Sequence, residues 1–215
     1  MMKKLFTQCL LVLITLMFAV NTQADMALLD IQQQWAKVNY QMKDDAQVEG
    51  FESLISDIEK HLASNPKDVE YIIWKGISLS TLAGAKGGLG ALSIAEQAKE
   101  TFEQAIEING AALNGSAYTS LGTLYSNVPG WPLGFGSDKK AKKLFIQALE
   151  INPDGIDSNY FYADFLYNER KYKDALKYLE RAKQAKQRPD RPIADEGRRK
   201  EIEILLKKLK KKIRK

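Results

Sequence analysis

Side chains able to do catalytic chemistry are sparse in this sequence of 215 residues. It contains one histidine, His61, and one cysteine, Cys9, whereas a zinc site needs several such ligands. No GxSxG, HExxH or lysine-bearing phosphate loop is present. The stretch AGAKGGLGAL is rich in glycine but lacks the GK[ST] ending of a phosphate loop, so we interpret it as a flexible insertion. We therefore expect no catalytic residues, no metal and no cofactor, and a protein that is not an enzyme.

Binding chemistry is better represented, above all in the segment YSNVPGWPLGFGSDKK. Its prolines restrict the backbone before any partner arrives, which lowers the entropy lost on binding. Two interpretations remain open for its aromatic residues. In the first, Trp131 and Phe135 fold back as a lid on the core. In the second, they form a contact patch or the wall of a pocket, because exposed aromatic anchors commonly supply binding energy.

The first residues have the layout of a secretory signal peptide, which indicates export. Two lysines precede an uninterrupted apolar run from about Leu10 to Val20, and small Ala24 follows a short polar segment. Cleavage after Ala24 would remove residues 1–24 and with them Cys9. A retained membrane anchor is the alternative, but the apolar run is short for a spanning helix. The sequence thus predicts a soluble protein of a bacterial periplasm.

Charge is distributed unevenly along the chain. The segment 198–215 carries ten Lys and Arg against two Glu, so the rest of the chain after residue 24 is mildly acidic. Nucleic acid is a weak interpretation of this basic tail because the protein is expected to be exported, and we predict no nucleic-acid partner. Weak contact with an anionic membrane surface is a second alternative. We favour a third, in which the tail is a capping helix with a solvated basic face.

Internal repeats organise the middle of the chain. KETFEQAIEING and KKLFIQALEINP superimpose with a constant offset that places Phe102 on Phe145, and YKDALKYLERA repeats the same spacing. Apolar residues recur at helical intervals in each copy. Each copy also follows another helical stretch, namely VEYIIWKGISL, SAYTSLGTLY or SNYFYADFLY. The sequence predicts three pairs of helices in tandem.

This pattern, bulky–bulky–small–bulky in the first helix and Ala–bulky–Ala in the second, resembles the tetratricopeptide repeat (TPR). The resemblance implies an all-α, right-handed solenoid of antiparallel helix pairs. Two of the turns within pairs are longer than the family's, at AGAKGGLGAL and at the Trp131 loop. We assign residues 25–66 to a degenerate N-terminal cap, 67–187 to three TPR-like repeats, and 188–215 to a linker and a basic capping helix, with the caps at the two ends of the array.

The same resemblance implies a binding groove along the first helix of each repeat. The groove positions that it assigns are Glu70, Ile73 and Ile77; Ser116, Thr119, Thr123 and Ser126; and Asp157, Tyr160, Asp164 and Tyr167. They lack the Lys and Arg clamp that family members use for a C-terminal carboxylate, so such a peptide terminus is not the expected ligand.

Enlarged turns on a short exported repeat protein are also similar to the T-component proteins associated with TRAP transporters. That similarity implies a role beside a solute-binding protein. The function predicted from the sequence is a non-enzymatic adaptor or scaffold that binds another, unidentified protein through the groove and the Trp131 loop. The alternative is a carrier of a small apolar ligand.

Overall fold

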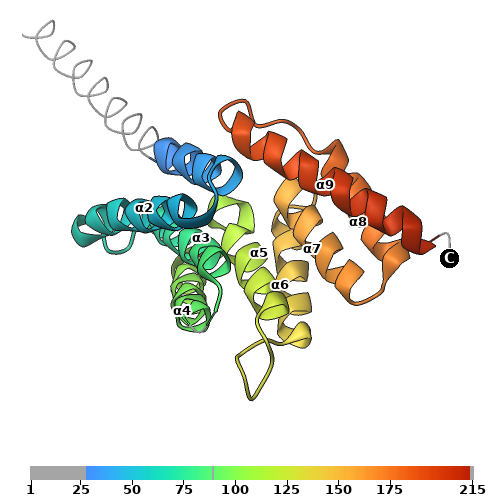
Figure 1. The fold of residues 1–215 in the computed structure, drawn as a ribbon, viewed down its shortest axis with the longest axis horizontal. Helices are drawn as coiled ribbons and strands as arrows, with labels where there is room; N and C mark the ends of the chain where they lie inside the picture. Colours follow the sequence, from blue (N-terminus) through green and yellow to red (C-terminus); the bar gives the residue numbers. More distant parts are fainter. Residues whose placement is uncertain (1–27, 89, 214–215) are drawn as a thin grey trace, which may run out of the picture.

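The computed structural model describes residues 28–88 and 90–213, and the regular secondary structure of this part of the chain is α-helical (Figure 1). A single bridge between Gly130 and Gly136 is its one β-type pairing. The all-α expectation is therefore confirmed. The predicted signal peptide, residues 1–24, lies outside the described residues.

The helices follow the predicted periodicity closely. After a helix of residues 28–41 come α2 (Asp44–Ser64), α3 (Val69–Lys86), α4 (Ala91–Asn109), α5 (Ala112–Asn127), α6 (Asp138–Ile151), α7 (Ile156–Asn168), α8 (Tyr172–Gln184) and α9 (Pro192–Ile213). In α5, residues Leu113 to Gly115 have positive φ, so its regular part begins at Ser116.

Only one of the two enlarged turns is a loop. Residues 128–137 connect α5 to α6, as expected. The stretch AGAKGGLGAL instead lengthens the helices on either side of it, because α3 continues to Lys86 and α4 begins at Ala91. Ala83 and Ala85 lie within α3, and Ala91 and Leu92 within α4, since alanine and leucine favour helix. The chain reverses at Gly87 and Gly88, whose φ values of 58° and 64° favour glycine.

Successive helices pack in pairs, α3 on α4, α5 on α6 and α7 on α8, while α3 also contacts α5 and α5 contacts α7. Small residues allow the close approach within a pair. A Cβ on Gly76 would lie 2.6 Å from the Phe102 ring, and one on Gly122 would lie 3.2 Å from Phe145. The small and bulky positions that the repeats predicted therefore face each other across the first two pairs.

The two segments expected to cap opposite ends of the array meet each other instead. The Tyr40 ring lies directly against Gly197 of α9, and Gln33 Nε2 donates a hydrogen bond of 3.0 Å to the Asp190 carbonyl. Figure 1 shows the blue helix of residues 28–41 beside the start of α9. This hydrogen bond joins residues that are 157 positions apart in the sequence and holds the helix of residues 28–41 against the segment that leads into α9.

Helix α9 buries one apolar face, from which Ile213 at its end stays exposed. Ile202, Leu205, Leu206 and Leu209 are all buried, and the helix packs on α7 and α8. The lysines from Lys207 to Lys212 are exposed. The apolar face that an amphipathic membrane helix would insert is thus occupied within the protein, which leaves the lysines for any contact with a membrane surface. None of the described helices is both long and apolar enough to cross a membrane.

Candidate functional site

A cavity of about 470 Å³ lies between the helix of residues 28–41, the segment 188–198 and the helices beside them. Six segments contribute lining residues: the helix of residues 28–41, α2, α3, α5, α7 and the segment 188–198. Cavities of a few hundred cubic ångströms are typical of small-molecule sites. This cavity is the candidate site, and its walls differ in chemistry.

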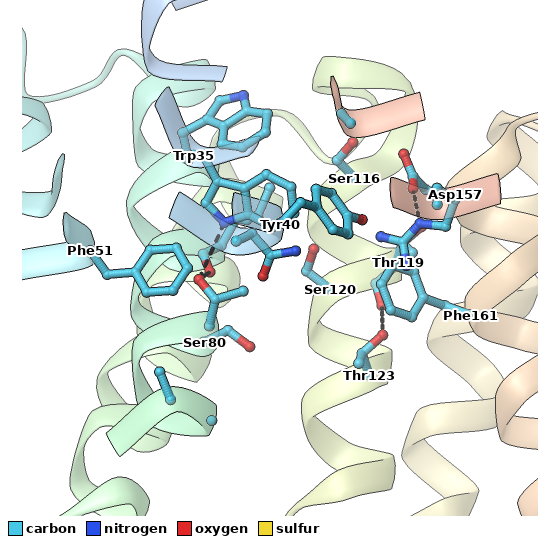
Figure 2. Close-up of a pocket in the computed structure, with 18 of the residues that line it drawn as sticks. Trp35, Tyr40, Phe51, Ser80, Ser116, Thr119, Ser120, Thr123, Asp157 and Phe161 are labelled. Carbon is cyan, nitrogen blue, oxygen red and sulfur yellow. Dashed lines mark hydrogen bonds and ion pairs between the residues drawn. The ribbon is translucent and has the colours of Figure 1, made fainter. Parts of the chain in front are cut away.

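Aromatic side chains form one wall of the cavity. Trp35 lies edge-on to Trp74 with ring centroids 5.8 Å apart and edge-on to Tyr40 at 6.0 Å. The Trp35 indole donates a hydrogen bond of 3.2 Å to Thr81 Oγ1, which fixes its orientation. Burial raises the pKa of Tyr40 to about 12, so its hydroxyl is a neutral donor at physiological pH. Figure 2 shows Trp35, Tyr40 and Phe51 on the side of the cavity that faces α5.

Hydroxyl groups of α5 form the facing wall. Ser116, Thr119, Ser120 and Thr123 recur at helical spacing and line the cavity together (Figure 2). Ser116 donates its proton to the Leu113 carbonyl at 2.6 Å, and Thr123 donates to the Thr119 carbonyl at 2.9 Å. Their oxygen lone pairs remain to accept hydrogen bonds from a ligand. This wall therefore suits a ligand that carries N–H or O–H groups.

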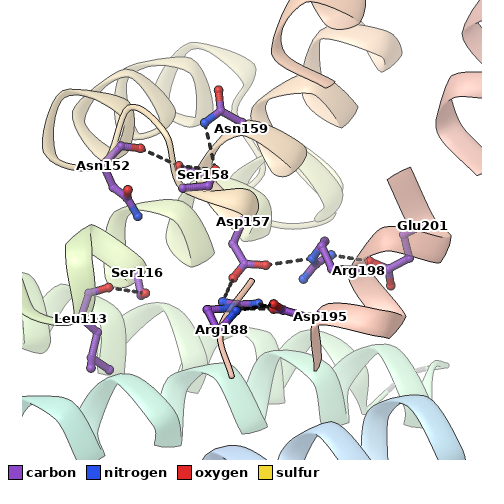
Figure 3. Close-up of polar contacts among 11 residues, drawn as sticks. Leu113, Ser116, Asn152, Asp157, Ser158, Asn159, Arg188, Asp195, Arg198 and Glu201 are labelled. Carbon is purple, nitrogen blue, oxygen red and sulfur yellow. Dashed lines mark hydrogen bonds and ion pairs between the residues drawn. The ribbon is translucent and has the colours of Figure 1, made fainter. Parts of the chain in front are cut away.

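Arginines and carboxylates join α7 to the segment 188–201. Asp157 accepts from Arg188 Nη1 at 2.7 Å and from Arg198 Nε at 2.8 Å (Figure 3). Asp195 pairs with Arg188, and Glu201 with Arg198. Burial alone would raise the pKa of Asp157, but the two guanidinium groups outweigh it and hold that pKa well below its usual range. The network fixes the start of α9 over α7.

Arg191 is the one arginine at the cavity that this network does not include. Its guanidinium lies 5.1 Å from the centre of the Trp74 ring. Within residues 28–88 and 90–213 its side chain makes no hydrogen bond or ion pair, and its Nε is buried without a partner. Burial and repulsion by Arg188 lower the pKa of Arg191. Its attraction to Asp157 and Asp195 does not compensate.

A second cavity, of about 750 Å³, continues from the first. The two cavities share six lining residues, which are Trp74, Ser116, Thr119, Asp157, Arg188 and Arg191. Arg191 and Trp74 therefore lie at the boundary between the cavities, where a group bound to the arginine would be reachable from both.

Several residues assigned to the groove do line the cavities. Ile77, Thr119 and Thr123 line the first, together with Ser116 and Asp157. Ile73 does not, because its side chain is fully buried in the core. Ser126 is absent from the lining, although its neighbour Asn127 belongs to it, and Ser126 donates to the Thr123 carbonyl. Glu70 is also outside the lining.

The groove residues of the third repeat lie toward α9. The Arg198 guanidinium is 4.6 Å from the centre of the Tyr160 ring. Burial raises the pKa of Asp164, with Lys208 and Arg198 of α9 opposing the rise. Tyr167 packs on Tyr172 at 5.6 Å. Tyr160 and Asp164 thus lie near the protein's own C-terminal helix, whereas Tyr167 contacts α8, and all three are absent from the lining of the two cavities.

The Trp131 loop divides into an anchored part and an exposed part. Phe135 packs edge-on to Tyr125 at 5.6 Å, with Lys99 Nζ 5.3 Å from its ring centre. Trp131 is 90% exposed and Leu133 is 73% exposed. Phe135 thus folds back on the protein, whereas Trp131 does not. The loop lines neither cavity.

The residues that sequence reasoning missed are Trp35, Trp74, Arg188, Arg191 and Arg198. Arg198 was counted with the solvated face of the basic tail. The segment RPDRPIADEGR did carry a signal, since its arginines are interleaved with carboxylates and prolines rather than grouped with the lysines. His61 stacks on Tyr71 at 3.6 Å and pairs with Asp68 at 2.9 Å, away from both cavities.

Comparison with protein-family models and with curated proteins found no match to this chain. A TPR assignment therefore depends on the residue pattern and on the packing of the helix pairs.

Proposed function

We propose that this protein is a non-enzymatic adaptor that binds a partner protein through the tip of the Trp131 loop. The observation that carries the proposal is the exposure of Trp131 and Leu133, which are 90% and 73% exposed. Large apolar side chains exposed side by side are characteristic of contact surfaces, and tryptophan is among the residues that contribute most to binding energy.

The loop is held in shape before a partner binds, which favours this role. Gly136 N donates to the Pro129 carbonyl at 2.9 Å, and Leu133 N donates to Gly130 at 3.1 Å. At the base, Ser137 N donates to the Tyr125 carbonyl at 2.8 Å. A loop that is already ordered loses little conformational entropy on binding, so more of the contact energy appears as affinity.

Charge beside the loop indicates the chemistry of the partner. The first turns of α6 follow the loop directly and expose Lys139, Lys140, Lys142 and Lys143. A cleft that is apolar at its centre and acidic at its rim would complement this surface. The proposed partner is a protein with such a cleft.

We further propose that the helix pairs form a TPR-like solenoid and that the protein is exported to a bacterial periplasm. Tandem pairing of α3–α8 and the small residues between paired helices support the first proposal. The layout of residues 1–24 supports the second. The similarity to TRAP T-component proteins makes a solute-binding protein a natural partner to test.

Photo-crosslinking tests the adaptor proposal. A photoreactive residue at position 131 should give a discrete adduct with one protein, and the same residue at Ile146, exposed on α6, should not. Leu133→Asp in the same chain should weaken binding of the purified partner at least about tenfold, as expected for loss of a buried apolar contact. Lipid adducts alone, or crosslinks only within the chain, would reject a protein partner for the loop.

Ligand carriage is a second candidate function, favoured by the cavity of about 470 Å³ with its aromatic wall. A wholly apolar ligand would not match this lining, because the wall opposite the aromatic residues carries hydroxyls and the boundary with the second cavity carries arginines.

A further inference from the structure

Arg191 is an arginine of the cavity lining whose charge no ion pair within the described residues neutralises. Arginine presents five N–H donors in a rigid plane and remains charged, so a partly buried arginine is normally paired. Arg188 and Arg198 obey this rule through Asp157, Asp195 and Glu201. Arg191 is half-buried, yet no ion pair among the described residues includes it.

We propose that Arg191 binds the carboxylate of a small organic acid whose flat apolar body occupies the cavity of about 470 Å³. The inference builds on the second candidate function, ligand carriage, and names the ligand's chemical class.

The geometry around Arg191 selects a carboxylate. The Trp74 ring, 5.1 Å from the guanidinium, supports it by a cation–π contact and limits its rotation. A guanidinium held in one plane offers parallel donors that match the two oxygens of a carboxylate. The carboxylates nearby are already committed, since Asp157 bonds Arg188 and Arg198, and Asp195 bonds Arg188.

The cavity walls select the rest of the ligand. Trp35, Tyr40 and Phe51 present ring faces and edges to the same space into which Arg191 projects. Flat apolar groups pack well against such rings. The hydroxyls of Ser116 and Thr119 border both cavities beside Arg191. They have given their protons to helix carbonyls, so they accept hydrogen bonds from any N–H or O–H near the acid group.

Calorimetric titration with 1-naphthoate and its neutral isostere 1-naphthamide tests the proposal. The intact protein should bind the naphthoate about 10- to 100-fold more tightly, as expected for charge-assisted hydrogen bonds. Arg191→Gln should reduce the naphthoate affinity to that of the naphthamide without changing the latter. Arg191→Lys should retain part of the preference, since it keeps the charge but not the planar donors.

Lys186→Gln is the matched control, because Lys186 is exposed and lines only the second cavity. It removes the same charge and should leave both affinities unchanged.

Three results would overturn the proposal, and they differ in what they imply for ligand carriage. Equal binding of naphthoate and naphthamide would leave carriage in place and reject recognition of the acid group. A preference that survives Arg191→Gln would assign recognition to another cation. Failure of both compounds to bind at about 1 mM, the weak end of specific affinity, would reject carriage of this ligand class altogether.

Discussion

Two arginines with similar positions in the sequence have opposite roles at the level of the single residue. Arg198 is buried to 7% exposure, and it bonds Asp157 and Glu201 while lying over the Tyr160 and Phe161 rings. Arg191 has a ring beneath it and no carboxylate bonded to it. Arg198 therefore stabilises the fold, whereas the N–H donors of Arg191 have no carboxylate of the described chain bonded to them.

Substitution of each arginine by glutamine should separate these roles. Arg198→Gln leaves Asp157 with one guanidinium in place of two, and we expect the free energy of unfolding to fall by about 3 kcal/mol. Arg191→Gln should change it by less than about 1 kcal/mol, because no ion pair is lost. Urea denaturation measures both. Equal losses from the two substitutions would show that Arg191 is also structural.

Glycines in α3 illustrate how packing decides the effect of one residue at the level of the element. Gly76 and Gly84 are both helical, so alanine should suit both positions equally in an isolated helix. Gly76 lies against Phe102, whereas nothing lies within 4 Å of a Cβ built on Gly84. Contact with α4 alone distinguishes them.

Alanine at these two positions should therefore have effects of opposite sign. Gly76→Ala forces the Phe102 ring to move, and overpacking of this kind costs about 1–3 kcal/mol. Gly84→Ala should stabilise the protein by about 0.5–1 kcal/mol, because alanine loses less backbone entropy on folding. Thermal unfolding of both variants tests the pairing of α3 with α4. Stabilisation by both substitutions would contradict the close approach of these helices.

At the level of the whole molecule, the main feature is the contact between the helix of residues 28–41 and the segment 188–198. The helix of residues 28–41 supplies Trp35 and Tyr40 to the cavity, and the segment 188–198 supplies the arginines. A ligand in this cavity would contact side chains from both segments. The contact of Tyr40 with Gly197 is thus the point at which the fold and the site depend on each other.

Gly197→Ala should weaken the packing of the helix of residues 28–41 against the start of α9, since a Cβ at this position overlaps the Tyr40 ring. We expect amide hydrogen exchange to increase at least about tenfold in residues 28–41 and in residues 190–198, with little change in α5 and α6. Gly90→Ala is the control, because no atom lies within 4 Å of a Cβ there. An increase at only one end would mean that the ends are not coupled through this contact.

The sequence by itself determined the helices, the tandem pairs and the small residues between them, such as Gly76 and Gly122. These features follow from periodicity within a single segment, where residues three or four apart share a face. Ile77, Thr119 and Thr123 were assigned to a groove by the resemblance to the TPR, and all three line the cavity.

Only the tertiary structure decided which surfaces those helices left open. Tyr160 and Asp164 lie toward α9, and Trp35 and Arg191 meet across one cavity, because the angles between successive helices add up over the chain. Those angles depend on many side-chain contacts and leave no pattern in any one segment. The fold class is therefore a local property of this sequence, whereas its candidate binding site is a property of the assembled whole.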